Sequence, residues 1–387
     1  MNYLLELTIK IVIFEIMKHI ILSVTNDLVT DQRVHRIATT LINNKAEVTL
    51  VGRLLPDSLP LQRKYNTYRM RLLFKKGPLF YAEYNIRLFF YLLFAKADIL
   101  VSNDLDTLLA NYLVSIIRRK VLVHDAHEYF TGLPEIQDRK LVLLVWQTIE
   151  RFVFPKLQYI YTVNDSIARL YTEKYNNKNI YVVRNLPIKV SKDQWPNRNT
   201  LGLPADKKIL IIQGAGINMH RGAEEAILAI NYLTDVILLI IGEGKVVPNL
   251  KKMVSSLHLE NNVMFKPKMP FEELICYTHL ADVGLSLDKD TNINYRYSLP
   301  NKLFDYIQAG IPVLCSNLEE VAKIVNAWKI GMVAESHEPK YLAKMINEML
   351  KNENQIELWK QNLAKAAEEL CWENEEKELL KIYEKLP

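Results

Sequence analysis

The residues best suited to binding a phosphate and a sugar hydroxyl lie in the segment SLPNKLFDYIQAGIP, residues 298–312. Ser298 and Pro300 favour the start of a helix. Free N–H groups at a helix start attract phosphate, and Lys302 adds a positive charge. Asp305 lies about one turn further along, where a carboxylate can accept hydrogen bonds from both hydroxyls of a ribose. A capped helix with an exposed lysine and aspartate explains the same residues, so both interpretations stay open at this point.

Other polar residues directly follow predicted strands, and ligands in open α/β sheets bind beyond the carboxyl ends of the strands. His127 ends a predicted strand in the sequence DAHE. A strand points alternate residues to opposite faces, so His124 and His127 should point apart. A histidine near a strand end is often a packed or capping residue. The DAHE context favours a role in the site for His127.

Two Asn-Asp pairs also follow predicted strands. They are Asn26 with Asp27, and Asn103 with Asp104. We expect them at the rim of a cleft, where they could bind acceptor hydroxyls. Ordinary turn chemistry explains Asn-Asp pairs equally well.

Short β-branched runs alternate with helical patterns along the whole chain, which is typical of parallel sheets with helices on both faces. A chain of 387 residues also exceeds what one core usually serves, so we expect two doubly wound domains that face each other. The predicted strands of the first are residues 19–24, 46–51, 97–102, 121–127, 159–163 and 179–183. Those of the second are residues 208–214, 236–244, 263–265, 283–287 and 311–315.

These patterns predict four parts. They are an N-terminal extension (1–16), a first Rossmann-like domain (17–190), a second Rossmann-like domain (205–350) and C-terminal helices that pack back on the first domain (351–387). The extension MNYLLELTIKIVIFEI lacks a basic start and a cleavage site, and it is too short to span a bilayer. Either it precedes a natural start at Met17, which we favour slightly, or it is an interfacial anchor.

The net charge of +5 is too mild to indicate a nucleic-acid partner. The three widely spaced cysteines form no metal or redox motif, which fits a reducing, cytoplasmic compartment. Basic and aromatic residues interleave over 63–76, ahead of the apolar run 88–95. Such a stretch is typical of a surface that rests on an anionic membrane. A solvated loop followed by a buried helix is equally compatible with it.

Several motifs, in this order, carry a resemblance to a known family. They are TNDLVTDQRVHRIATTL (25–41), DAHEYF (125–130), YTVNDSIARLY (161–171), VVRNLP (182–187), GAGINMHRG (214–222), IGEG (241–244) and the segment 298–312. With them the chain, from Lys18 to about Leu386, resembles the family-4-like retaining glycosyltransferases (glycosyl transferases group 1). These have the GT-B fold and use a nucleotide sugar as donor. The resemblance implies that the first Rossmann-like domain binds the acceptor and the second the nucleotide-sugar donor.

The resemblance implies roles for individual residues. Asp305 matches the acid that holds the donor ribose, Arg221 the cation that neutralises the donor diphosphate, and His127 the histidine that contacts the transferred sugar. The further donor-binding candidates are Ser298, Asn301, Lys302, Gly216, Glu243 and Tyr297. Two positions depart from the family pattern, because Tyr297 replaces an acid and Ala215 replaces a basic residue. The glycine pair that the family has after the first strand is also absent.

The implied activity is transfer of a sugar from a nucleoside diphosphate sugar to an acceptor hydroxyl, with retention of configuration. No DxD motif is present, so no metal or other cofactor is expected. The implied acceptor is a glycan or lipid-linked intermediate at the cytoplasmic face of a membrane, as in surface polysaccharide assembly. A sugar-nucleotide epimerase remains an alternative, and so does a non-catalytic sugar-nucleotide-binding subunit, which Tyr297 and Ala215 favour. No GxGxxG follows the first strand, which argues against a nicotinamide dehydrogenase.

Overall fold

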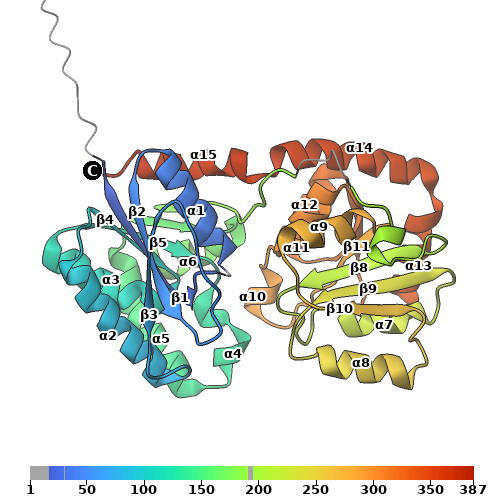
Figure 1. Ribbon diagram of the computed structural model, residues 1–387, viewed down its shortest axis with the longest axis horizontal. Helices are drawn as coiled ribbons and strands as arrows, with labels where there is room; N and C mark the ends of the chain where they lie inside the picture. Colours follow the sequence, from blue (N-terminus) through green and yellow to red (C-terminus); the bar gives the residue numbers. More distant parts are fainter. Residues whose placement is uncertain (1–16, 30, 191–194) are drawn as a thin grey trace, which may run out of the picture. The chain divides into compact units, whose positions relative to one another are not determined.

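A computed structural model describes residues 17–29, 31–190 and 195–387 of the chain. It contains two parallel sheets flanked by helices (Figure 1), as the alternation of β-branched and helical segments predicts. The predicted N-terminal extension lies outside the described residues. The chain divides into two compact units, one ending at Val123 and the other running from His124 to Pro387.

The first sheet has seven strands in the order β3-β2-β1-β4-β5-β6-β7. Its strands are β1 (His19–Asp27), β2 (Glu47–Leu54), β3 (Asn66–Arg71), β4 (Ile99–Asn103), β5 (Val121–Ala126), β6 (Tyr159–Thr162) and β7 (Ile180–Val182). The helices along this part of the chain are α1 (Gln32–Asn43), α2 (Pro78–Phe94), α3 (Leu105–Arg118), α4 (Pro134–Gln137), α5 (Lys140–Val153) and α6 (Asp165–Tyr175).

Sequence patterning located most of these elements. Asp31 caps α1, as its position predicts, because its side chain accepts a hydrogen bond from the Val34 N–H at 3.1 Å. The strand β3 was not predicted. It lies inside the basic and aromatic stretch. Most of its side chains are exposed and Met70 is the one that is buried in the core, so the sequence lacks the alternation of apolar and polar residues that marks a strand. As an edge strand it needs little apolar sequence.

The second sheet has six strands in the order β10-β9-β8-β11-β12-β13. Its strands are β8 (Lys208–Gly214), β9 (Val236–Gly242), β10 (Val263–Lys266), β11 (Val283–Ser286), β12 (Val313–Ser316) and β13 (Gly331–Ala334). The helices are α7 (Ala223–Ile230), α8 (Val247–Ser256), α9 (Phe271–His279), α10 (Ile293–Arg296), α11 (Asn301–Ala309), α12 (Glu319–Trp328) and α13 (Pro339–Lys351). The strand β13 was also missed, since it is four residues long and begins with a glycine.

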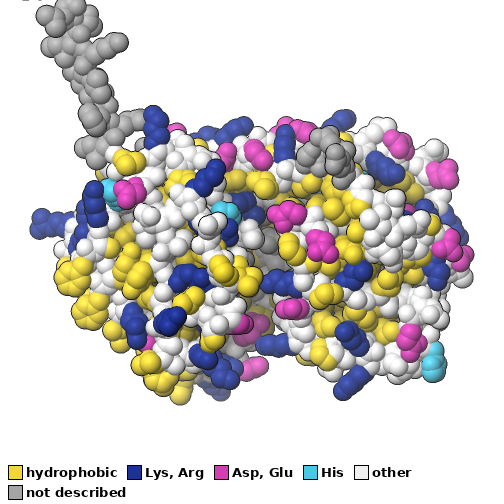
Figure 2. Space-filling view, in the orientation of Figure 1, with side chains coloured by type: hydrophobic (Ala, Val, Ile, Leu, Met, Phe, Trp, Pro, Cys, Tyr) yellow, Lys and Arg dark blue, Asp and Glu magenta, His cyan; other side chains and the backbone are white. Residues whose placement is uncertain are grey.

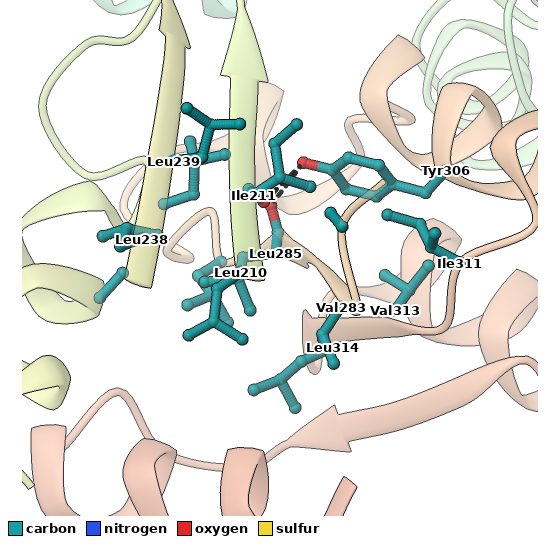
Figure 3. Close-up of a cluster of buried hydrophobic side chains, with 14 of the residues drawn as sticks. Leu210, Ile211, Leu238, Leu239, Val283, Leu285, Tyr306, Ile311, Val313 and Leu314 are labelled. Carbon is teal, nitrogen blue, oxygen red and sulfur yellow. Dashed lines mark hydrogen bonds between the residues drawn. The ribbon is translucent and has the colours of Figure 1, made fainter. Parts of the chain in front are cut away.

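The strand order of the second sheet reverses between β8 and β11. A buried side chain of the core sets the position of α11 relative to these two strands. The two strands pair over only two positions, Val283 with Leu210 and Gly284 with Ile211. At this point the Tyr306 hydroxyl lies within hydrogen-bond distance of two strand carbonyls, 3.2 Å from that of Ile211 and 3.1 Å from that of Leu285 (Figure 3). Tyr306 belongs to α11 and is fully buried, so it anchors that helix to both strands.

A glycine makes room for this ring. A Cβ atom on Gly284 would lie 2.5 Å from ring atoms of Tyr306, closer than real contacts allow. Burial raises the pKa of the Tyr306 phenol well above its usual value, so the hydroxyl stays protonated and able to donate. The position of α11 therefore follows from packing rather than from surface contacts.

The C-terminal helices α14 (Glu353–Glu369) and α15 (Trp372–Tyr383) return to the segment that follows β7, as predicted. The Trp372 N–H donates to the Pro187 carbonyl at 2.8 Å. The buried carboxylate of Glu375 accepts from the Arg184 guanidinium at 2.9 and 2.6 Å. The final helix is therefore held to the first sheet's edge by charge as well as by its apolar side chains.

We predict that Tyr306→Phe lowers the free energy of unfolding by about 1–3 kcal/mol, because two buried carbonyls lose a donor. Urea denaturation followed by circular dichroism would measure this. Tyr277→Phe is the matched control, since the Tyr277 ring is buried but its hydroxyl forms no hydrogen bond within the described part of the chain. Equal losses in the two variants would contradict the anchoring role.

Candidate functional site

A buried carboxylate, Asp288, joins two cationic side chains just beyond the end of β11. Asp288 is 1% exposed. Its two oxygens lie 3.2 Å from Lys302 Nζ and 3.2 Å from Arg221 Nη1. A buried charge is stable only when it is paired and hydrogen-bonded, so the carboxylate fixes both cations. These three residues come from β11, α11 and the loop after β8, and they meet where the strand order reverses.

The loop after β8 is pressed against the end of β11, which places Arg221. Gly222 has a φ of 79°, and a Cβ atom there would lie 2.3 Å from the Leu287 carbonyl oxygen. The Lys289 N–H donates to the His220 carbonyl at 2.8 Å. The Arg221 guanidinium also lies 4.6 Å from the centre of the Tyr295 ring, a cation–π contact that restricts it further.

Asp305 lies one helical turn beyond Lys302, with its carboxylate oriented by the end of β8. Its Oδ2 accepts a hydrogen bond from Gln213 Nε2 at 3.0 Å. Gln213 in turn accepts from the Thr278 hydroxyl at 2.6 Å. The amide of Gln213 is buried, so this chain of bonds holds Asp305 in one orientation.

The start of α11 is not capped by a side chain. Pro300 occupies the N-cap position, and no side chain of the described residues accepts a hydrogen bond there. The Ser298 hydroxyl instead donates to the Tyr295 carbonyl at 2.9 Å, and the Asn301 side chain accepts from Asn185 at 2.9 Å. A helix start of this kind attracts an anion through its N–H groups and its dipole.

Two glycine-rich loops pack closely beside this cluster. The Ile217 N–H donates to the Glu243 carbonyl at 2.8 Å. A Cβ atom on Gly244 would lie 1.8 Å from the Ile217 carbonyl oxygen, so only glycine fits. Gly216 belongs to the same loop as Ile217, and the Glu243 side chain is exposed. Close loop packing therefore accounts for the glycines, and it leaves the Glu243 carboxylate accessible to a ligand.

Tyr297, which stands where the family pattern has an acid, ends α10. Its carbonyl accepts a hydrogen bond from Asn164 at 2.7 Å. Its phenol interacts with the guanidinium groups of Arg169 and Arg296. The side chain is therefore held among surface arginines and supplies no negative charge at this position.

His127 lies one residue beyond β5, which ends at Ala126 rather than at the predicted position. Its Nε2 is 2.9 Å from the fully buried carboxylate of Asp125. His124 is buried against the edge of the Phe154 ring, with the ring centres 5.7 Å apart. The two histidines thus have different surroundings, although strand alternation does not extend to His127 because β5 ends before it. An acid-paired histidine has a defined ring orientation.

The neighbour of His127 connects this loop to the segment around α10. The Glu128 carboxylate accepts a hydrogen bond from Asn294 Nδ2 at 3.1 Å. A Cβ atom on Gly132 would lie 2.5 Å from a methyl carbon of Ile293. The His127 loop and the start of α10 are therefore in direct contact within the unit that begins at His124.

The predicted acceptor-side residues lie in the other unit, at the ends of β1 and β4, where the first sheet's order reverses. Asn26 donates to Asp31 at 3.2 Å, and Asn103 donates to the Ser23 carbonyl at 3.1 Å. Asp104 has a φ of 60°, and its carbonyl accepts a hydrogen bond from a serine hydroxyl.

Asp27 is also engaged locally. Its carboxylate accepts hydrogen bonds from the Ser58 hydroxyl, the Val29 N–H and the Arg69 guanidinium. Partial burial alone would raise the pKa of this carboxyl, but these bonds together hold the pKa below its usual value. These contacts shape the turn after β1.

Sequence reasoning missed three residues of the site. Asp288 lies just beyond the end of β11, so the rule that ligands bind beyond the ends of strands would have found it. Gln213 lies near the end of β8. Gln213 was detectable as a lone polar residue in the apolar run KILIIQG. The pairing of Asp125 with His127 joins the end of β5 to the residue that follows it, and no local pattern marked it.

Comparisons with known proteins show which family and which fold the chain resembles. Residues 193–366 match the family model described as glycosyl transferases group 1. Over 153 residues the chain is 24% identical to the chitobiosyldiphosphodolichol beta-mannosyltransferase of Debaryomyces hansenii, a match that covers 38% of this chain and 32% of that protein.

Two solved structures show the same fold. Sucrose-phosphate synthase from Thermosynechococcus elongatus is similar with a TM-score of 0.76 and 16% identity, over 95% of this chain and 98% of that one. The Anabaena protein HepE, in complex with UDP and glucose, is similar with a TM-score of 0.74 and 14% identity, over 95% of this chain and 100% of that one. The fold is therefore GT-B.

We predict that Asp288→Asn lowers the free energy of unfolding by about 3 kcal/mol, because the buried ammonium of Lys302 loses its compensating charge. Chemical denaturation at neutral pH would measure the loss. Asp290→Asn is the matched control, since the exposed Asp290–Arg296 pair should contribute about 0–1 kcal/mol. Adding Lys302→Met to Asp288→Asn should restore part of the stability. A loss no larger than that of Asp290→Asn would refute the pairing argument.

Proposed function

We propose that the chain, which has the GT-B fold, is a glycosyltransferase of the glycosyl transferases group 1 and that its donor is a nucleoside diphosphate sugar. The sugar passes to a hydroxyl of a glycan or lipid-linked acceptor with retention of configuration, in surface glycan assembly at the cytoplasmic face of a membrane. The observation that carries the proposal is the cluster of Asp288, Arg221 and Lys302 beside the uncapped start of α11.

The cluster suits a departing nucleoside diphosphate. Arg221 and Lys302 carry two positive charges against the single negative charge of Asp288, so one positive charge remains for the diphosphate. Both cations are held before the ligand arrives, which avoids reorganisation as negative charge develops on the leaving group. The N–H groups at the start of α11 add to this field, so the proposal needs no divalent ion.

Asp305 is the proposed ribose-binding acid. It lies one helical turn from Lys302, a spacing that suits a phosphate and the ribose attached to it. The hydrogen bond from Gln213 orients its carboxylate, a group that accepts hydrogen bonds from ribose hydroxyls. HepE, which shares the fold, was solved with UDP, and this supports a nucleoside diphosphate as ligand.

His127 is the proposed contact to the transferred sugar. The carboxylate of Asp125 orients its ring, which a contact of defined geometry to a sugar requires. Asn26, Asp27, Asn103 and Asp104 remain the proposed acceptor-side residues. The name of the mannosyltransferase relative includes a diphosphodolichol, which supports a lipid-linked acceptor.

The deciding experiment uses purified protein, a set of UDP-, GDP-, ADP- and CMP-linked sugars and a membrane extract as acceptor. Transfer of labelled sugar to the extract supports the proposal. NMR of the product linkage reports whether configuration is retained, and a chelator should leave the rate unchanged. Conversion of the donor to an epimer without any acceptor would instead identify an epimerase. Donor binding with no transfer to any fraction would identify a binding subunit.

We predict that Asp305→Ala and Arg221→Ala have different effects. Asp305→Ala removes hydrogen bonds to the ribose and should raise the donor dissociation constant about 10- to 100-fold. Arg221→Ala removes charge that stabilises the leaving group and should lower kcat about 100-fold, more than it weakens binding. Calorimetry with the nucleoside diphosphate and steady-state kinetics measure the two effects. Unchanged affinity in Asp305→Ala would refute the ribose assignment.

For His127 we predict a loss of turnover with little change in nucleotide affinity, because the residue is assigned to the sugar rather than to the nucleotide. His127→Ala should lower kcat about 10- to 100-fold, and Asp125→Asn should lower it by a smaller factor through ring orientation. Thermal shift with the nucleoside diphosphate is the parallel readout. Full activity in His127→Ala would remove this residue from the site.

A further inference from the structure

The segment from Arg63 to Lys96 is much more basic than the rest of the chain. It holds eight Lys and Arg residues and one acidic residue, Glu83, a formal charge of +7, whereas the whole chain has +5. The segment includes the edge strand β3 and the helix α2. Charge of one sign on a limited part of the surface attracts a partner of opposite charge.

The side chains of β3 and α2 enclose a groove of about 720 Å³ on this segment. Arg69, Arg71 and Arg87 line it, together with the aromatic rings of Tyr68, Phe90 and Phe94. Asp27 pairs with Arg69, and Glu83 pairs with Arg87. Arg71 is exposed and has no ion-pair partner within residues 17–29, 31–190 and 195–387. The groove therefore combines apolar walls with guanidinium groups.

Large apolar side chains also stand in solvent around the groove. On α2 the outward residues Leu79, Ile86, Phe90 and Phe94 form one stripe, and Phe94 is 81% exposed. On α3, which packs against α2, Leu113, Ile116 and Ile117 are exposed as well. Figure 2 shows hydrophobic side chains gathered at the left, over α2 and α3, with Lys and Arg among them. Contiguous exposed apolar surface of this kind marks an interaction site.

Glu83, the single acidic residue of the segment, helps to hold apolar side chains of the preceding turn in exposed positions. The Glu83 carboxylate accepts hydrogen bonds from the N–H groups of Leu73 and Phe74, at 2.9–3.0 Å. These bonds fix the turn between β3 and α2 while both side chains point outward, with Leu73 79% exposed. Lys75 and Lys76 follow directly and are exposed. The turn thus presents two apolar and two basic side chains together.

We propose that this basic apolar face, formed by β3, residues 72–77, α2 and the outward side of α3, binds the headgroup region of an anionic phospholipid bilayer. The aromatic and aliphatic side chains enter the interface, and the guanidinium and ammonium groups contact lipid phosphates. The inference deepens the proposed membrane-side function, but lipid binding itself does not depend on catalysis. No helix in the part of the chain that the structure describes is long and apolar enough to cross a membrane.

Other partners fit this face less well. Two copies of this face would repel each other on contact, because residues 66–94 hold five Lys and Arg residues and one acidic residue, a formal charge of +4. A nucleic acid would leave the exposed Phe and Ile side chains without apolar partners. An anionic bilayer satisfies both the charge and the apolar surface.

The test is co-sedimentation of the full chain with vesicles of phosphatidylcholine alone or of an equimolar mixture with phosphatidylglycerol. The wild type should bind the mixed vesicles and not the neutral ones. Arg71→Glu with Lys75→Glu should lower the partition coefficient at least about 25-fold, since each basic residue near the surface contributes about fivefold. Phe90→Ser with Phe94→Ser should lower it about tenfold or more.

Two controls lie on α14. Lys360→Glu and Leu358→Ser change an exposed charge and an exposed apolar residue outside the face, and they should leave binding unchanged. Unaltered circular dichroism and unaltered thermal shift with nucleoside diphosphate would show that all variants are folded.

Three results would overturn the inference. They are equal binding to neutral and anionic vesicles, equal losses in the α14 controls, and self-association that Phe90→Ser with Phe94→Ser abolishes without any vesicle binding. Displacement from vesicles by glycerol phosphate at constant ionic strength would also overturn it, because the site would then recognise free phosphate. Failure of sugar transfer with charge-dependent vesicle binding intact would refute only the proposed function.

Discussion

The buried negative charge of Asp288 imposes the arrangement of the second unit's site. An unpaired carboxylate at this depth would destabilise the fold, so Arg221 and Lys302 must approach it. Arg221 can do so only because Gly222 lets its loop press against β11. Lys302 can do so only because Tyr306 anchors α11 to the strand carbonyls. The positions of the two cations thus depend on the packing of the core, which is the most rigid part of a protein.

The two sheets have the same strand order for their first six strands, yet their reversal points differ chemically. In the first sheet, the polar residues after β1 and β4 bond to one another and to nearby backbone. In the second, cations and an uncapped helix start face the corresponding position. One topology therefore carries cationic side chains at the reversal point of one sheet and locally bonded Asn and Asp side chains at that of the other, as expected when loops rather than folds determine chemistry.

The sequence predicted the fold class and most strands, because buried parallel strands leave long apolar runs such as those at β8 and β9. It also predicted the return of the last helices to the first sheet. It missed β3 and β13, whose short, mixed sequences depend on pairing with neighbours. Among site residues, Lys302 and Arg221 were identified singly. Their joint contact with Asp288 was not, since it links three segments through tertiary packing that no local pattern encodes.

The contact between Arg184 and Glu375 has a consequence for biosynthesis. These two residues are 191 positions apart, and Glu375 belongs to the last helix of the chain. During translation the segment after β7 cannot form this ion pair until α15 has been synthesised, 191 residues later. The strands of the first sheet are therefore all synthesised well before the helix that packs beside its β7 edge.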